Sequence, residues 1–523
     1  MAFNNVTINK GQGGLGRALP GTDYISGILF YSDQTAPTGF TTANSRIVTV
    51  YSVEDAEDYG ITNAHLNATA ATGSYEVTTK FAANDTFKIT CATIDSTNPI
   101  EDIATAGTVT LCDFTAVTAD AVSITTSGDR IALEINNGTP THGFSAVNTT
   151  GTVVITAPKN QGIFLNSGTP YVVTKTGSVA GTLTQSVTPG VASHVDILHY
   201  HISEFFRLQP KGKLYVSFQA TADVGTFSKA TTLQDVAGGE IKQLAVYYIS
   251  TAFTSAHCTT LQSINTALEA LHKPYWSILL AGEISGTANV TSLTTNLRLL
   301  TAPTVSVVIG QDGANDGFTL FKATGKSITN VGETLGAVAL ANVNESIAWL
   351  AKYQVSATEL DWAAYANGQL FKDVSNGASV NLDSYGYMFL RKVIGLGGTY
   401  HNRPYTCVSS TSDYSFIQNN RTIYKAIQNT RAILLPETGR PILVNSDGTL
   451  TEDVIGYFQG LCKQALDVMV RDSEISNYAA IIDPAQNVLS TNELVITIQI
   501  QPVGVADFIT VNIGFTDVIT TTV

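Results

Sequence analysis

Two patterns of apolar and polar positions divide this chain of 523 residues. Before residue 62 and after residue 192, short apolar runs alternate with longer segments in which apolar residues recur every three or four positions. The runs are typical of buried strands and the longer segments of amphipathic helices, so their alternation predicts a largely parallel sheet covered by helices. Between these limits the chain has short alternating runs separated by turn-forming residues, which is typical of a small β-sandwich or barrel.

The α/β part is predicted to begin with two strands and a short helix. Ser52, with Asp55 three residues later, is a variant of the capping box for a helix that ends at Gly60. A second helix is expected over 195–208, directly after the β-rich block. The predicted strands are 25–31, 46–51, 213–218, 244–249, 276–281 and 305–309, and the later helices are 261–271, 289–300 and 330–352.

The β-rich block is predicted to be an all-β insertion into a loop of the α/β domain, because the α/β pattern resumes directly after it. Surface loops tolerate long insertions, since the entropy of closing a loop grows slowly with its length. The block is almost uncharged, with 5 basic and 9 acidic residues. Its expected strands include 86–90, 121–125, 131–135 and 152–156.

The C-terminal part is predicted to hold helices over 415–435 and 451–471, followed by two half-buried strands. Every second residue of these strands is apolar, namely Leu494, Ile496, Ile498 and Ile500 in the first and Ile509, Val511, Ile513 and Phe515 in the second. Near the N-terminus, Val6 and Ile8 form a similar short run before a glycine-rich arm. Strands at both ends of a chain have unpaired edges that proteins usually hide, and pairing with a neighbouring subunit is one way to do so.

Composition favours a protein that buries much of its surface against other subunits. Charged residues make up 13% of the chain and its net charge is −14, against about 25% charged residues in an ordinary soluble protein. Nucleic acid is not an expected partner, because phosphate binding needs clustered Lys and Arg. The start of the chain is not a signal peptide, and no apolar run reaches the ~18 residues of a membrane span.

The five cysteines are scattered and form no CxxC pair. They are interpreted as reduced thiols of a chain made in the cytoplasm. Cys91 and Cys112 are the pair considered for an oxidising medium, but a disulfide between them is not expected.

No motif in the chain predicts catalysis, a cofactor or a metal. Residues 11–16 fit G-x-G-x-x-G, but Pro20 and Gly21 follow too soon for the helix that a dinucleotide site needs. His199 and His201 point to different faces of a helix, and His194 and His201 have no third ligand beside them. The segment 312–317 resembles part of a calcium loop without its closing Glu, and Cys407, His401 and Asp413 form a loose trio without a meaningful spacing.

Charged residues also mark the two C-terminal helices. The first carries Arg421, Lys425 and Arg431, and the second carries Glu452, Asp453 and Asp467. The simpler interpretation is a pair of solvated faces, and the functional alternative is charge matching between stacked subunits.

Several segments together resemble the contractile tail sheath proteins of phages, in particular the sheath family of Mu-like phages. They are the N-terminal 6–10 run with its glycine arm, 53–61, 198–206, and the stretch from 439–442 through the 451–471 helix to the strands at 494–515. The resemblance covers the chain except 62–192.

The resemblance implies a mixed α/β fold with a conserved core, an outward inserted domain and arms that exchange strands with neighbours. The expected division is an arm at 1–20, an α/β core at 21–61 plus 193–435, the insert at 62–192 and an inner C-terminal domain at 436–523. The arm strands would be about 4–9 and 508–515.

The function implied is structural and not enzymatic. The subunit would polymerise helically, as stacked hexameric rings, around an inner tail tube protein and contract to drive that tube through the host envelope. Baseplate and tail terminator proteins would be further partners, and the location would be the virion tail after assembly in the host cytoplasm.

Two other functions are weighed against it. An adhesive virion or surface protein would bind carbohydrate through the insert, with a face formed by Phe81, Phe87, Phe114, Phe144, Phe164 and Tyr171. An enzyme would need a pair of deeply buried carboxylates in a cleft.

Overall fold

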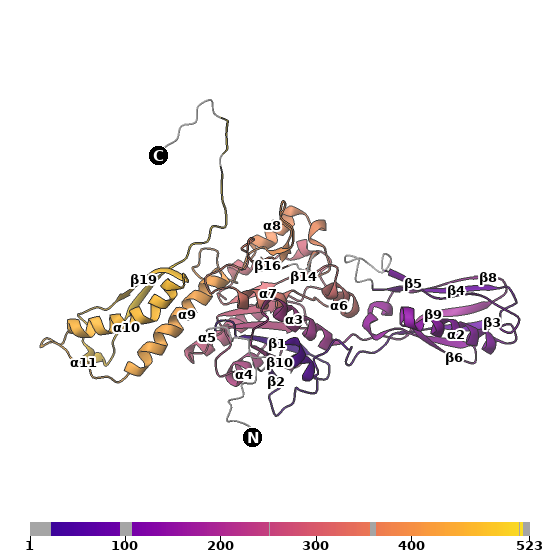
Figure 1. Cartoon of the computed structure of the whole chain (residues 1–523), viewed down its shortest axis with the longest axis horizontal. Helices are drawn as coiled ribbons and strands as arrows, with labels where there is room; N and C mark the ends of the chain where they lie inside the picture. Colours follow the sequence, from indigo (N-terminus) through magenta and orange to yellow (C-terminus); the bar gives the residue numbers. More distant parts are fainter. Residues whose placement is uncertain (1–21, 95–106, 250, 356–361, 512, 516–523) are drawn as a thin grey trace, which may run out of the picture. The chain divides into compact units, whose positions relative to one another are not determined.

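The computed structural model describes residues 22–94, 107–249, 251–355, 362–511 and 513–515 (Figure 1). The chain divides between Asn420 and Arg421 into an N-terminal unit and a C-terminal unit, and each is described by itself.

A seven-stranded sheet forms the centre of the N-terminal unit, in the order β16-β13-β12-β11-β1-β10-β2. All neighbouring pairs are parallel except β10 and β2, which confirms the predicted, largely parallel sheet. The strands are β1 Ser26–Ser32, β2 Ile47–Val50, β10 Leu214–Ala220, β11 Gln243–Tyr248, β12 Ser277–Ala281, β13 Val305–Val308 and β16 Tyr387–Met388.

Both faces of this sheet are buried, which explains the near-continuous apolar strands. On β1, Ile28 and Phe30 belong to a core shared with α3 (His194–Leu208) and α7 (Val331–Leu340). Leu29 and Tyr31 belong to the opposite core, shared with α4 (Lys229–Val236) and α5 (Ser255–Ala270). The sheet is therefore the middle layer of three.

Local capping explains where two predicted helices begin. The Ser52 side chain accepts the N–H of Asp55 at 3.1 Å and starts α1 (Val53–Asp58). Ser193 does the same for Asp196 at the start of α3. Each bond satisfies one backbone donor that a helix N-terminus leaves without a partner.

The β-rich block forms two antiparallel sheets around a core of its own. One has the order β6-β7-β3-β9 and the other β5-β4-β8. Thr69 and Val191 exchange two backbone hydrogen bonds of 2.9 Å, so the two ends of the block lie side by side. The strands are β3 Thr72–Thr79, β4 Thr86–Thr93, β5 Gly107–Thr115, β6 Ser145–Thr149, β7 Thr152–Thr156, β8 Tyr171–Thr176 and β9 Ala180–Thr188.

The expectation of an all-β block was wrong in one respect, because strands predicted at 121–125 and 131–135 are replaced by the helix α2 (Ile124–His142). Ser123 and Thr126 form a reciprocal capping box at its start. Ile131 and Ile135 are buried, whereas Leu133 between them is 52% exposed. The apolar residues on both sides of Leu133 thus follow a helical spacing of four rather than a strand spacing of two.

Two predicted helices of the α/β part were also wrong in extent. Over 289–300 there are only two 3₁₀ turns, because the side chains of Asn289 and Asn296 accept N–H groups two residues ahead and so compete with helical bonding. The helix predicted to reach 352 ends at Leu340, where Gln209 donates to the Ala339 carbonyl.

Shorter elements complete the N-terminal unit. Two further sheets have two strands each, β14 with β15 and β17 with β18. Their bounds are β14 Gly310–Asp312, β15 Ala363–Tyr365, β17 Leu390–Arg391 and β18 Tyr400–His401, and the remaining helices are α6 Asp316–Thr324 and α8 Asn376–Ser384.

The C-terminal unit contains two long helices and a two-stranded sheet. The helices α9 (Ile417–Leu434) and α10 (Glu452–Arg471) confirm the predictions at 415–435 and 451–471. The unit begins within α9, at Arg421. Its other elements are β19 Ile475–Ile481, α11 Val488–Thr491 and β20 Thr497–Pro502.

None of the helices in the described ranges is long and apolar enough to cross a membrane.

The close contact of α3 with α7 makes a first prediction. A Cβ atom at Gly332 would lie 2.4 Å from the carbonyl oxygen of His201, so Gly332→Ala must push the helices apart. We expect the free energy of unfolding of the N-terminal unit to fall by about 1–3 kcal/mol, measured by urea unfolding. Gly377→Ala in α8 is the control, because nothing lies within 4 Å of its Cβ position, and equal losses for the two variants would contradict the packing argument.

Candidate assembly interface

The C-terminal unit holds a sheet of only two strands. β19 and β20 pair in antiparallel fashion from Ile481 opposite Thr497 to Ile475 opposite Pro502, with an irregularity at Ser476. Within the described ranges no third strand joins this sheet. Two-stranded sheets are marginally stable by themselves, and each outer edge presents backbone N–H and C=O groups to which another strand can bind.

One face of this sheet is covered from within the unit. Tyr478, Ile498 and Ile500 pack against a cluster that includes Leu466 and Met469 of α10. Thr497, Gln499 and Gln501 of β20 face away and are exposed. The predicted half-buried strand is thus confirmed for 497–502, whereas Leu494 and Ile496 lie before β20 and pack beside a second cluster of Leu450, Phe458 and Ile482.

The segment after β20 exposes its apolar side chains. Ile509, Val511, Ile513 and Phe515 are 82, 69, 91 and 111% exposed, and the described residues of 503–515 form neither strand nor helix. The strand predicted at 508–515 is therefore not formed within a single chain. A row of exposed apolar residues of this kind marks an interaction surface. Val6 and Ile8 lie outside the described residues.

The predicted inter-subunit charges have different environments. Arg421 is buried, and Lys425 contacts Glu474 of the same unit at 2.5 Å. Asp467 accepts the hydroxyl of Tyr478 at 2.6 Å, and burial together with this carboxylate raises the pKa of Tyr478.

The remaining three predicted charges are half-buried or exposed. Arg431 is half-buried. Glu452 and Asp453 are exposed in the first turn of α10, where the helix dipole favours a negative charge. Asp467 is also exposed, but it already accepts a hydrogen bond from Tyr478, so Glu452 and Asp453 are the better candidates for contact with another subunit.

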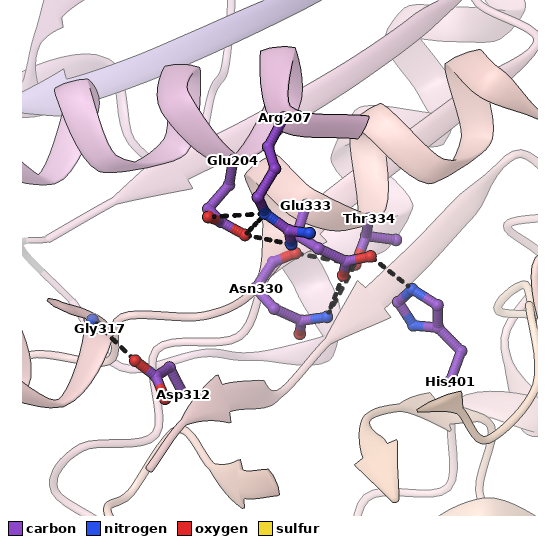
Figure 2. A network of polar contacts seen from close by, with 8 residues as sticks. All are labelled: Glu204, Arg207, Asp312, Gly317, Asn330, Glu333, Thr334 and His401. Atoms are coloured by element: carbon purple, nitrogen blue, oxygen red, sulfur yellow. Dashed lines mark hydrogen bonds and ion pairs between the residues drawn. The ribbon is translucent and has the colours of Figure 1, made fainter. Parts of the chain in front are cut away.

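A network of buried polar side chains in the N-terminal unit provides the carboxylate pair that an enzyme would need (Figure 2). Two guanidinium nitrogens of Arg207 in α3 donate hydrogen bonds of 2.6–3.1 Å to the carboxylate of Glu204. The carboxylate of Glu333 in α7 lies 3.2 Å from Nε2 of His401 in β18 and accepts a hydrogen bond of 2.8 Å from the side-chain amide of Asn330. The side chains of Glu204, Glu333 and His401 are 5, 0 and 1% exposed.

This network supports a structural role. The carboxylates of Glu204 and Glu333 are buried and have partners from the same unit, as buried ionic groups require. A pocket of about 310 Å³ in the same unit is formed by other residues, among them Val290, Asn381 and Tyr385. The Glu333–His401 contact ties α7 to β18, whereas the Arg207–Glu204 contact lies within α3 and interacts with Glu333 electrostatically.

The calcium-loop candidate is also satisfied internally. Asp312 accepts the backbone N–H groups of Ala314, Asn315 and Gly317 at 3.0–3.1 Å. Both carboxylate oxygens thus hold the turn that begins α6. Burial raises the pKa of Asp312 to about 6, against the lowering effect of these hydrogen bonds.

The histidines of α3 contact different partners. His194 lies 3.2 Å from Asp33 and His199 lies 3.2 Å from Glu57, whereas His201 is fully buried and burial lowers its pKa to about 3. In the part of the chain that the structure describes, no three His, Cys, Asp or Glu side chains are grouped to hold a metal ion. The 11–16 glycine motif lies outside the described residues.

Two other sequence candidates are not assembled as sites. His401 contacts Glu333, whereas the sulfur of Cys407 lies beside Cys258, so Cys407, His401 and Asp413 form no catalytic trio. The six aromatic residues proposed as a carbohydrate-binding face are all buried in the core of the β-rich block, at 0–8% exposure. That proposal was wrong. Phe87, Phe114 and Tyr171 lie on strands whose alternation turns their rings inward, and the other three rings pack into the same core from segments between the strands.

Two family models match this sequence. The N-terminal domain of DUF2586 matches residues 129–403 and the C-terminal domain of DUF2586 matches residues 413–519. The chain belongs to the DUF2586 family. The C-terminal match includes α10, both strands of the open sheet and the apolar tail. No curated protein matches this DUF2586 chain in sequence.

The DUF2586 chain is similar in structure to sheath proteins. The helical sheath of the anti-feeding prophage in its contracted state has 14% identity and a TM-score of 0.41, covering 61% of this chain and 81% of that one. The contracted PVC sheath complex of an extracellular contractile injection system has 14% identity and a TM-score of 0.39, covering 61% and 80%. The sheath tail protein of Desulfitobacterium hafniense has 11% identity and a TM-score of 0.36, covering 95% and 100%.

Sequence reasoning missed β19, the partner strand of β20. After the irregularity at Ser476, Tyr478, Ala480 and Ile482 alternate inward, and this period of two was the available signal. The Glu333–His401 contact had no such signal, because 68 residues separate its partners.

Asp312 makes a prediction about pH. Its pKa of about 6 in the folded chain exceeds the ~3.9 of an unfolded Asp, so its stabilising contribution is complete below pH 4 and is lost as the pH rises through 6. The amide that Asp312→Asn introduces cannot titrate. We expect the unfolding free energy of wild type relative to Asp312→Asn to fall by on the order of 3 kcal/mol between pH 4 and 7, measured by urea unfolding.

Asp85 is the control of opposite sign. Backbone hydrogen bonds, the one from Ala82 first, hold its pKa below the usual range. The stability of wild type relative to Asp85→Asn should therefore rise with pH over the acidic range. The same slope for both variants would contradict the assignment.

Proposed function

We propose that this chain is the sheath subunit of a contractile injection system and assembles with copies of itself into a helical tube. The observation that supports it most is the C-terminal unit, where a two-stranded sheet is followed directly by an exposed segment of alternating apolar residues. The unit thus contains both a strand to give and an edge to receive one. The resemblance of the chain to contractile tail sheath proteins agrees with this reading.

The free energy of binding the tail favours its addition as a strand over a contact made by its apolar side chains alone. Burying the four side chains of Ile509, Val511, Ile513 and Phe515 is worth roughly 6–12 kcal/mol. Ordering the backbone of 509–515 costs about 7–14 kcal/mol. The two terms nearly cancel, so backbone hydrogen bonds, at about 0.5–1.5 kcal/mol each, decide whether the tail binds. A sheet edge supplies such bonds.

The geometry of such a contact leads to a polymer. The tail of one subunit and the sheet edge of the next are different surfaces, so the contact is heterologous, and repeated heterologous contacts form rings or helices. In the proposed sheath the N-terminal strand at 4–9, with Val6 and Ile8, is a second donor, and stacked hexameric rings form the tube. Glu452 and Asp453 are available for charge matching between layers.

Contraction follows from subunits that move as rigid bodies while the exchanged strands keep them joined. Backbone pairing tolerates such rotation because it does not depend on particular side chains. The extended tube would then be a metastable state held by kinetic barriers. The sheet covered on both faces and the buried contact of α7 with β18 support the rigidity that the N-terminal unit needs for this movement.

We also propose the division into an arm at 1–20, a core at 21–61 plus 193–435, an insert at 62–192 and an inner domain at 436–523. The meeting of Thr69 with Val191 and the separate core of the insert support it. As an almost uncharged block joined at adjacent ends, the insert suits the outside of the tube.

In its finer form the proposal is a phage tail sheath, assembled in the host cytoplasm and carried by the virion. The inner tail tube protein, the baseplate and the tail terminator are the expected partners. The subunit would drive the tube through the host envelope without binding nucleic acid or inserting into the membrane itself.

The tail makes a prediction about assembly. Replacing Ile509 and Ile513 by serine removes two apolar contacts of about 1.5–3 kcal/mol each. We expect the critical concentration for tube formation to rise by roughly 10²–10⁴-fold, measured by sedimentation and confirmed by electron microscopy. Ile394→Ser is the matched control, because Ile394 is also fully exposed, at 104%, but lies in the N-terminal unit. An unchanged critical concentration in the double variant would contradict strand exchange by the tail.

The insert makes a second prediction about assembly. Because Thr69 and Val191 are hydrogen-bonded, a short glycine linker can replace residues 70–190 without stretching the core. We expect this variant to form tubes at a concentration close to that of the full chain. If the variant is folded by circular dichroism but remains monomeric, the insert carries the assembly contacts and the proposed architecture fails.

A further inference from the structure

Two cysteines that are far apart in sequence meet inside the N-terminal unit. The sulfur atoms of Cys258 and Cys407 lie 3.9 Å apart, although 149 residues separate them. Both residues are 0% exposed. The other described pair on neighbouring strands, Cys91 of β4 and Cys112 of β5, is out of register, because Cys91 is opposite Val109 and Cys112 is opposite Ile89.

We propose that Cys258 and Cys407 are a latent disulfide site, which closes when the folded protein meets a small peroxide-type oxidant. A disulfide needs sulfurs about 2.05 Å apart, so the two atoms must approach by roughly 2 Å. Rotation about the Cα–Cβ bonds of two facing cysteines, with a small shift of one backbone, supplies a movement of that size.

The surroundings determine which side moves. The backbone of Cys407 is held by two hydrogen bonds, from its N–H to Val305 and from Ala302 to its carbonyl, at 2.8 and 2.9 Å. Cys258 is the fourth residue of α5, and its N-cap Thr254 makes no side-chain hydrogen bond to the helix. The first turn of α5 is anchored through His257, whose ring lies 3.0 Å from the Tyr248 hydroxyl, but its backbone N–H groups receive no bond from the cap side chain, so we expect this side to be the one that moves. Its opening gives both the movement and the access that a small oxidant needs, since Thr254 and Ala256 are exposed.

A half-buried cation lies close enough to assist the reaction. Arg298 stacks over the Tyr405 ring at 3.9 Å and donates to the carbonyls of Thr406 and Val408, on either side of Cys407. Its charge favours the Cys407 thiolate, which is the reactive form. The hydrogen bond with Cys258 and burial act in the opposite direction and raise the pKa of Cys407, so the neutral thiol predominates and the reactive thiolate is the minor form.

The chemistry is balanced with hydrogen peroxide as the oxidant. One thiolate attacks the O–O bond, which gives a sulfenic acid and hydroxide, and the second thiol then attacks that sulfur and releases water. In sum, two thiols lose two electrons and two protons, and one peroxide becomes two waters. The product links the first turn of α5 to the strand-like segment beside β13, within the seven-stranded sheet domain.

The test is peroxide treatment of the full-length protein, followed by alkylation in denaturant and mass spectrometry without reduction. We expect a peptide that joins Cys258 to Cys407, and a fall by two in the number of alkylatable thiols, from the five of the reduced chain. The same treatment in urea is the reference, because an unfolded chain has no preference for this pair. The 258–407 link should therefore be at least tenfold enriched in the folded sample.

Variants separate the site from general oxidation. Cys258→Ser should abolish the link and leave Cys407 alkylatable, whereas Cys91→Ser should leave the link unchanged. Oxidation should also raise the melting temperature of wild type and not of Cys258→Ser, because a cross-link restricts the unfolded chain. No enrichment over urea, or an equal yield of a 91–112 link in the folded protein, would overturn the proposal; both readings use wild type and do not depend on the variants folding.

Discussion

The hydrogen-bonding groups at the edges of the C-terminal sheet need partners, and no further strand among the described residues supplies them. In this sheet β19 pairs with β20. The tail that follows has the alternating apolar residues of a strand, yet Ile509, Ile513 and Phe515 are almost fully exposed. The same molecule thus has a tail that can add as a strand and a sheet edge that can receive one. The simplest way to pair both is to bind a second copy of the chain.

The N-terminal unit has a different character, because its central sheet has no uncovered face. Apolar cores cover the seven-stranded sheet on both sides, and the buried Glu333–His401 contact joins α7 to β18. In the proposed sheath such a unit would move as one body, and the C-terminal sheet would be the place where subunits are joined. A contractile polymer needs both properties, with rigid subunits that rotate and joints that survive the rotation.

Local patterns predicted most of the fold. The parallel strands, α3, α9 and α10 followed from apolar spacing and caps such as Ser52, because those signals lie within a few residues of each other. α2 was misread because Ile131 and Ile135 fit both a strand and a helix, and only burial separates the two. The 289–300 segment failed because Asn289 and Asn296 use their side chains to compete with helical bonds.

The candidate sites divide in the same way. The alternation of apolar residues from Ile509 to Phe515 was visible in the sequence. Whether this segment forms a strand depends on a partner outside the chain, which the sequence pattern does not reveal. Contacts over long sequence separations, such as Glu333 with His401 or Cys258 with Cys407, had no local signal. Lys425 was predicted to pair with a charge on another subunit, but it forms an ion pair with Glu474 of its own unit.

Hydrogen–deuterium exchange of the full-length chain, before and after polymerisation, tests the exchanged strand most directly. The account predicts that amides of 503–511 exchange rapidly in the monomer and become strongly protected in the polymer, while β1 and β11 are protected in both. Amides of 503–511 that stay unprotected in the polymer, or that are already protected in the monomer, would contradict it.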